Sequence, residues 1–216
     1  MSETKETAKA CRIYLMRHGE TNLNAEKRFR GMTDCDLSAR GFEQARLMGQ
    51  KLKHVHFDYC ICSPLIRAVH TAETVLSQNE ASSVSPIVVP ELTSMKYGDW
   101  EGRKEAEIAE SEPERWAQFT NAIETVDFPG GESLAKLCAR ASAAVAEAVS
   151  KHQGNILVVT HQVVTRTLLC HYLNMPDARG YWRIGQETAC LNLVDVTDGK
   201  TVVQAINISA EHDPIE

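Results

Sequence analysis

The sequence predicts an α/β fold built on a mostly parallel sheet. Apolar runs alternate with helical segments, and three of the runs end abruptly at polar residues, as buried parallel strands do. These runs are Arg12–Met16, Phe57–Cys62 and Asn155–Thr160. The chain has 216 residues, of which 43% are hydrophobic and 24% charged, so one globular domain with a sizeable core is expected. We place this domain at 11–210, with flexible tails at 1–10 and 211–216.

Capping and turn residues predict where the elements between these strands begin and end. Ser38 is expected to cap the helix after the first strand, and Ser63 the helix after the second, which puts Arg67 in its first turn. The other expected elements are a short buried strand at Pro86–Pro90, helices at Arg103–Asn121 (Pro113 at a helix start), 134–152 and 161–171, and strands Thr188–Asp195 and Thr201–Ile208 around an Asp198-Gly199 turn.

Charge and hydropathy exclude several kinds of partner. Lys and Arg number 23 against 29 Asp and Glu, and the formal net charge of -6 argues against nucleic acid or an anionic membrane surface. No apolar run approaches the ~20 residues of a membrane span. The polar start Met1–Ala10 lacks the hydrophobic segment of a signal peptide. We therefore expect a cytoplasmic protein.

Cysteine usage agrees with a reducing compartment. The seven cysteines are odd in number and scattered, which suits free thiols better than a disulfide framework. Cys60 and Cys62 stand two apart on an expected strand, so both side chains point to one face. No second Cys or His pair with zinc spacing accompanies them, and we interpret them as core residues. No metal or cofactor is expected.

Charged and polar residues gather at the expected carboxyl ends of the strands. Arg17 and His18 follow the first strand, and Thr21 and Asn24 add donors suited to phosphate oxygens. Taken alone, an Arg-His pair after a strand is more often a surface salt-bridge partner than a catalytic centre. Arg67 and His161, however, are expected at the same sheet edge, because parallel strands present their carboxyl ends on one side. The pattern suggests phosphoryl transfer to His18.

Five stretches carry a resemblance to a known family. They are Leu15–Thr21 followed by Asn24, Leu37–Gly41, Ser63–Glu73, Leu92–Gly102 and Pro129–Ser133, with His161-Gln162 after the last parallel strand. Together they resemble the histidine phosphatase superfamily, in its phosphoglycerate mutase-like branch 1. The His-Gln-Val-Val string at 161–164 resembles the corresponding string of fructose-2,6-bisphosphatase domains. The chain as a whole resembles a phosphatase-type member of the family, similar to the broad-specificity phosphatases.

This resemblance implies a fold, a mechanism and a set of contacts. The fold would be a three-layer α/β/α sandwich in which about 95–137 forms a helical cap insertion. His18 would be the nucleophile that forms a phosphohistidine, and Arg17, Arg67 and His161 would stabilise the phosphoryl charge without a metal. The implied substrate contacts are Thr21, Asn24, Arg30, Gly31, Ser94 and Gln162.

One position departs from the family pattern. Relatives carry a glutamate in Leu-x-Glu-x-x-x-Gly, whereas this chain has Ser94 there. A hydroxyl has no accessible proton at neutral pH, so the general acid for the leaving group is missing from its expected place. Glu91 is our candidate replacement from a neighbouring position, and the alternative is a site without an acid.

The sequence is compatible with three functions. A metal-independent histidine acid-type phosphatase acting on a small phosphorylated metabolite leads. A phosphoglycerate mutase is less favoured, because the link 76–86 between the second and third motifs is short. A weakly active or non-catalytic phosphate-binding protein would follow from the missing acid. The substrate and the oligomeric state stay open, with a homodimer among the options.

Overall fold

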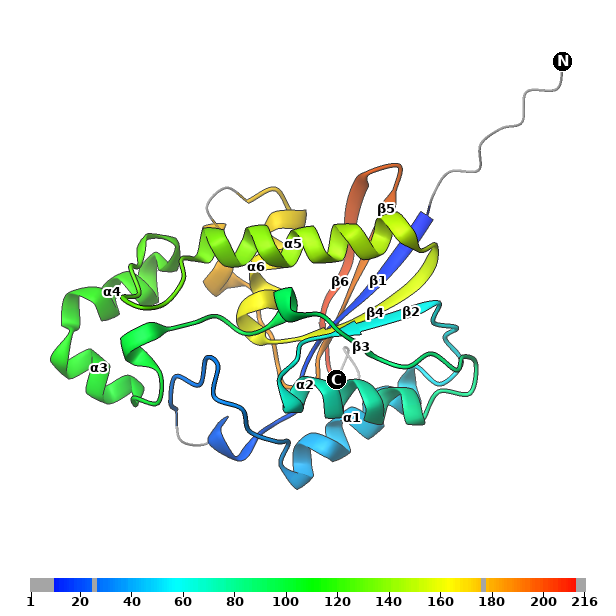
Figure 1. The fold of residues 1–216 in the computed structure, drawn as a ribbon, viewed down its shortest axis with the longest axis horizontal. Helices are drawn as coiled ribbons and strands as arrows, with labels where there is room; N and C mark the ends of the chain where they lie inside the picture. The colour runs from blue at the N-terminus through cyan, green and yellow to red at the C-terminus, as the bar shows by residue number, and fades with distance from the viewer. Residues whose placement is uncertain (1–9, 25–26, 176–177, 213–216) are drawn as a thin grey trace, which may run out of the picture.

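The computed structural model describes residues 10–24, 27–175 and 178–212, and its centre is a six-stranded sheet in the order β3-β2-β4-β1-β5-β6 (Figure 1). The strands are β1 Ala10–Arg17, β2 Tyr59–Cys62, β3 Ile87–Val88, β4 Gly154–Thr160, β5 Leu191–Thr197 and β6 Lys200–Ile208. Strands β1 to β4 pair in parallel, whereas β5 runs antiparallel to both its neighbours. The predicted mostly parallel sheet is confirmed.

Helices cover both faces of the sheet (Figure 1). On one face lie α1 (Ala39–Lys51) and α2 (Ile66–Ser77), and on the other α5 (Leu134–Lys151) and α6 (Gln162–Tyr172). Neighbouring strand residues point to opposite faces. Leu15 accordingly packs in the core under α5 and α6, while Met16 packs in the core under α1 and α2. The sheet thus lies between two layers of helices, with one core on each of its faces, which is the three-layer α/β/α sandwich that the resemblance implied.

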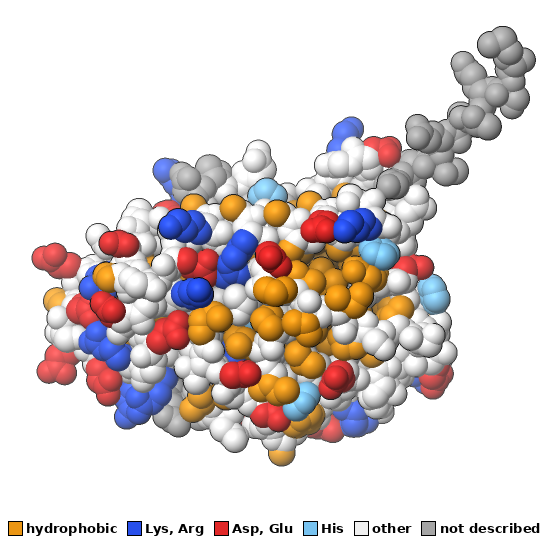
Figure 2. Space-filling view, in the orientation of Figure 1, with side chains coloured by type: hydrophobic (Ala, Val, Ile, Leu, Met, Phe, Trp, Pro, Cys, Tyr) orange, Lys and Arg blue, Asp and Glu red, His pale blue; other side chains and the backbone are white. Residues whose placement is uncertain are grey.

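The segment predicted as a cap forms one end of the molecule. It carries α3 (Glu105–Ser111) and α4 (Pro113–Asn121), at the left of Figure 1, and charged side chains are dense over it in Figure 2. Beneath them an aromatic cluster closes the end of the larger core, with rings of Phe29, Trp100 and Phe119 in edge-on contact at centroid distances of 5.1–5.7 Å. The cluster fixes this end against the loop that follows β1.

Most predicted starts and turns are confirmed. Ser38 caps α1 by accepting from the Gly41 amide, α4 begins at Pro113, and Ser133 caps α5. Asp198 and Gly199 form the β5–β6 turn with positive φ values of 49° and 76°.

Two predicted features are wrong. The strand at Pro86–Pro90 shrinks to Ile87–Val88 and is exposed, because β3 is an edge strand and its two residues stand 46% and 48% open to solvent. Hydrophobic side chains spread over this side of the molecule below α5 in Figure 2. Helix α2 begins at Ile66 after Leu65, so Ser63 is not its cap, although Arg67 does lie in the first turn.

Other predictions concern the thiols, the tails and the membrane. Cys60 and Cys62 are fully buried in the core under α1 and α2, and all seven cysteines are free. The expected tails fall mostly outside the described residues, but Ala10 begins β1 and Glu211 pairs with Arg40 at 2.9 Å. Among the described helices, none has the length and apolar character needed to cross a membrane.

Candidate active site

The register of the parallel strands brings the predicted residues to one edge of the sheet. Arg17 is level with Thr160 in the β1–β4 pair, so His18 and His161 leave neighbouring strands side by side. The His18 amide still bonds the Thr160 carbonyl at 2.9 Å, and the two imidazole centroids are 5.1 Å apart. Strand β2 ends beside β4 at Cys62, which delivers α2 and its Arg67 to the same edge.

His18 is buried, and its surroundings fix both its charge and its tautomer. Burial, with Arg67 and Arg17 nearby, lowers the pKa of the imidazole well below its ordinary value, so the ring is neutral. Its Nδ1 lies 2.7 Å from the Gly19 carbonyl oxygen, which only accepts hydrogen bonds, so Nδ1 carries the proton. Nε2 therefore holds the free lone pair.

The turn after His18 requires glycine. A Cβ on Gly19 would stand 2.5 Å from the carbonyl oxygen of Gly41, and a Cβ on Gly41 would stand 2.0 Å from that of Glu20. The start of α1 thus packs directly on the backbone of the loop that carries His18. This contact sets where the imidazole sits.

Two buried guanidinium groups flank His18, and each has one donor without a partner. Arg17 donates to the Gln186 carbonyl at 2.6 Å, and burial lowers its pKa to about 10. Arg67 donates to the carbonyls of Thr33 and Gly31, and its pKa is also lowered by burial. The Nε atoms of both arginines are buried with no hydrogen-bond partner. Unpaired buried donors beside a neutral imidazole are what an anion site provides before its anion arrives.

His161 supplies a third unpaired group. Its Nε2 lies 2.7 Å from the Ser63 hydroxyl, while its Nδ1 is buried without a partner. Burial, followed by the charge of Arg67, lowers the pKa of this imidazole well below its ordinary value. The Ser63 oxygen also accepts from the Leu65 amide, so its own proton is available for Nε2. When Ser63 donates to Nε2, the neutral His161 carries its proton on Nδ1 and can offer it to a bound anion.

The loop after β1 lines the site with further donors. Arg30 lines the pocket and donates to the Thr21 hydroxyl at 3.1 Å, and burial lowers the Arg30 pKa. Gly31, at a φ of +44°, lines the pocket too and lies against the Glu101 carboxylate. Thr21 is buried behind Arg30. Asn24 ends a short 3-10 turn, and its side chain lies outside the described residues.

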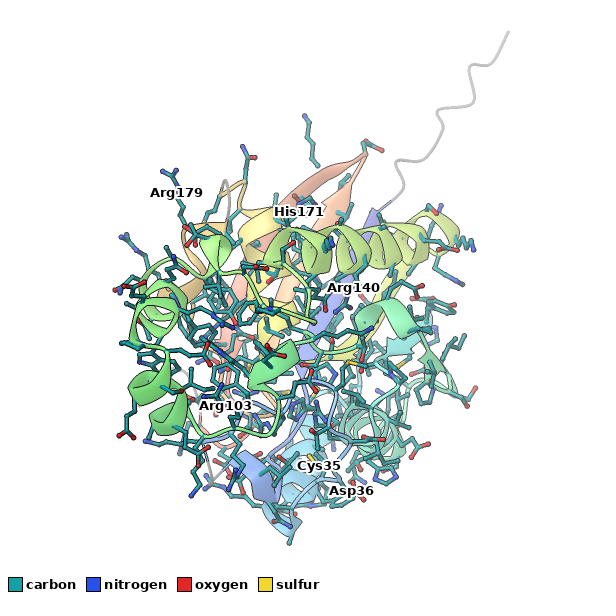
Figure 3. The ribbon with its side chains drawn as sticks, turned by 60° about the vertical axis from the view of Figure 1, so that its left-hand side comes forward. Cys35, Asp36, Arg103, Arg140, His171 and Arg179 are labelled. Atoms are coloured by element: carbon teal, nitrogen blue, oxygen red, sulfur yellow. The ribbon has the colours of Figure 1, made fainter. Side chains whose placement is uncertain are left out.

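Ser94 lines the pocket, whereas Glu91 does not. Glu91 is exposed on the short turn Pro90–Leu92, and only its carbonyl reaches inward, to accept from Arg140. Arg140 extends from α5 (Figure 3) and also bonds the carbonyls of Thr93 and Ser94, while Glu132 holds its guanidinium. The backbone of 91–94 is therefore held independently of the side chain at 94.

Several site residues were not predicted from the sequence. Gln162, which the sequence analysis proposed as a substrate contact, lines the pocket, and its amide shares the Gln186 carbonyl with Arg17. Gln186 and Ser63 were missed in these positioning roles. An aromatic wall was also missed, and its members are Phe29, Tyr97, Phe119, Tyr181 and Trp182. Adjacent aromatic residues at 181–182, in a segment with few apolar neighbours, are the one sequence signal that points to this wall.

The pocket around these residues measures about 180 Å³. Arg17, Arg28, Arg30 and Arg67 give it a concentration of positive charge that contrasts with the net charge of -6. Two larger hollows, of about 670 and 610 Å³, lie along α5 and contain none of the predicted site residues; His171 borders both (Figure 3). Within the described part of the chain, no three His, Cys, Asp or Glu residues cluster in a way that would hold a metal ion.

The fold and this pocket define a class of α/β protein that presents a neutral histidine among cations at a parallel sheet edge. Residues 13–209 match the histidine phosphatase superfamily (branch 1), and the chain belongs to this family. Over 201 residues it is 32% identical to the adenosylcobalamin/alpha-ribazole phosphatase of Escherichia coli (strain K12), covering 92% of this chain and 97% of that protein.

Other relatives broaden this similarity. A probable phosphoglycerate mutase GpmB of Salmonella choleraesuis is 32% identical over 165 residues, covering 76% of this chain and 75% of that protein. The solved structure of Bacillus stearothermophilus YhfR superposes with a TM-score of 0.85 at 29% identity, covering 94% of this chain and 100% of that chain. Phosphatases and probable mutases thus both occur among similar proteins.

Proposed function

We propose that this protein is a phosphatase that hydrolyses a phosphomonoester of a small metabolite through a phosphohistidine on His18. One observation carries the proposal: buried, unpartnered nitrogens of Arg17, Arg67 and His161 line the same pocket as a neutral imidazole whose Nε2 lone pair is free. An anion with several oxygens satisfies all three donors at once. The phosphorus at its centre then faces a nucleophile.

The chemistry follows from the tautomer of His18. Nε2 attacks phosphorus in line with the ester oxygen, and the Gly19 carbonyl stabilises the imidazolium that forms by accepting from Nδ1. Arg17, Arg67 and the Nδ1 proton of His161 bind the equatorial oxygens, where negative charge is spread in the transition state. Water then attacks the phosphohistidine, and phosphate leaves.

The substrate contacts proposed from the sequence fall into two groups. Arg30, Gly31, Ser94 and Gln162 line the pocket, so they are proposed as direct contacts. Thr21 acts through Arg30. The seven free thiols agree with a cytoplasmic setting, and the -6 charge with a metabolite rather than a nucleic acid as partner.

A second candidate function rests on Ser94. Without a carboxyl at this position, the protein would bind phosphate esters and turn them over slowly or not at all. A mutase is less favoured, because it must retain the phosphoryl group on His18 while a bisphosphate reorients, and the pocket of about 180 Å³ is small for that.

Single-turnover labelling separates these functions. Enzyme in excess over a radiolabelled phosphomonoester should yield an acid-labile, base-stable label on wild-type protein and none on His18→Ala, followed by release of inorganic phosphate. Binding of phosphate without any label would favour the binding protein. Transfer of the label to phosphoglycerate, in preference to water, would establish the mutase and overturn the proposal.

A further inference from the structure

Among the residues that the structure describes, none deep in the pocket carries a carboxyl group that could protonate a departing alkoxide. Position 94 presents a hydroxyl to the pocket, and the exposed Glu91 lies outside it. Among the described residues that line the pocket, Glu105 is the single carboxylate, at the exposed start of α3. The buried phenol of Tyr97 has its pKa raised well above its ordinary value, which makes it a poor acid.

A leaving group that needs no proton suits such a pocket. A phenol has a pKa of about 10, whereas the pKa of an alcohol is far higher and close to that of bulk water. A phenolate is therefore stable enough to depart with the electron pair of the broken bond. An alkoxide is a much poorer leaving group unless an acid protonates it.

Trp182 gives a second, independent reason to expect an aromatic leaving group. The residue is 41% exposed although it lines the pocket, and its indole N–H donates to the Phe119 carbonyl at 2.9 Å. The Arg166 guanidinium lies 5.2 Å from the ring centroid, and Tyr181 packs edge-on at 4.9 Å. The exposed aromatic surface is thus held rigidly beside the phosphate site, as a stacking surface must be.

Building on the proposed function, we infer that the substrates are aryl phosphates, whose flat leaving group stacks on Trp182 and departs without a proton from the protein. The pocket, at about 180 Å³, is much smaller than the two hollows along α5. A phosphoryl group and one ring fill it, and a larger leaving group extends past Trp182 into solvent.

The reaction balances without a general acid. Nε2 of neutral His18 donates its lone pair to phosphorus, the P–O bond breaks, and the phenolate keeps that electron pair. The intermediate is a phosphoryl group on an imidazolium. Water then adds to phosphorus, the P–N bond breaks with its pair returning to Nε2, and dihydrogen phosphate leaves. Its extra proton passes through solvent to the phenolate, which gives a phenol and hydrogen phosphate.

The first test measures the dependence of kcat/KM on the leaving group. Substituted phenyl phosphates should react faster as the phenol becomes more acidic, and alkyl phosphates should lag behind phenyl phosphate by at least about a hundredfold. Ser94→Glu should flatten this dependence and accelerate the alkyl substrates, whereas Glu105→Gln should leave it unchanged. Alkyl phosphates that are cleaved as fast as phenyl phosphates, or slowed selectively by Glu105→Gln, would overturn the inference.

The second test isolates the ring. Trp182→Ala should lower kcat/KM for phenyl phosphate by about three- to tenfold, the range expected for one aromatic pair. Acetyl phosphate, which has a stable leaving group but no ring, should be unaffected, and Trp182→Phe should restore most of the loss. An equal loss on both substrates would reject stacking. If neither substrate labels His18, the proposed phosphatase itself fails, so the two failures are distinguishable.

Discussion

Replacing Ser63 by alanine should slow turnover by removing the hydrogen bond that orders His161. The hydroxyl is fully buried and lies 2.7 Å from Nε2, with a proton available for it. Without this donor, the tautomer of His161 that carries its proton on Nδ1 loses its stabilising hydrogen bond. That tautomer is the one that can donate to a phosphoryl oxygen. A neutral hydrogen bond contributes about 0.5–1.5 kcal/mol, which corresponds to a loss in kcat of about two- to twelvefold.

The assay is a steady-state comparison of kcat and KM in a double-mutant cycle. Ser63→Thr keeps a hydroxyl and serves as the matched control, and the melting temperature of each variant checks that α2 is intact. In a His161→Gln background, Ser63→Ala should cost little further, because the group that it positions is gone. If Ser63→Ala lowered kcat equally in both backgrounds, the hydroxyl would act somewhere other than on His161.

Four further expectations follow from the site. Arg67→Ala should raise KM and lower kcat together, and an effect on KM alone would show uniform binding of substrate and transition state. Vanadate should inhibit and EDTA should leave activity unchanged, because side-chain cations do the work that a metal would do; loss on chelation that added metal restores would refute this. Stability should fall as pH drops below about 6.5. Burial lowers the pKa values of His18 and His161 in the folded protein, so these imidazoles bind protons in the unfolded chain at a pH where they stay neutral in the folded one. The melting temperature of His161→Gln should accordingly depend less on pH than that of the wild type. Gly41→Ala should abolish activity at modest cost to secondary structure, since its Cβ would collide with the Glu20 carbonyl; wild-type rates would contradict the packing argument.

The sequence predicted the part of the site that depends on strand ends. Arg17, His18 and His161 follow apolar runs, and a parallel sheet brings such ends together whatever the loops do. Arg67 was placed because it follows the second of these strands by a few residues. The layered fold was predictable for the same reason, because strand and helix periods are local properties of the chain.

Features that depend on tertiary position were not predictable. The exposure of Ile87 and Val88 follows from an edge position in the sheet, which composition does not reveal. Glu91 turns outward because Leu92, its neighbour on a tight turn, turns into the core. Trp182 lies on a loop without periodicity, so only its chemical type hinted at a contact surface.

The contacts of Arg140 with the segment 91–94 separate the position of this backbone from the choice of side chain at 94. Arg140 donates to the carbonyls of Glu91, Thr93 and Ser94, and Glu132 holds the guanidinium in place. None of these bonds involves the side chain of residue 94, so that side chain can change without displacing the backbone. The loop that carries residue 94 therefore works as a fixed mount, on which the side chain can be exchanged as a single variable.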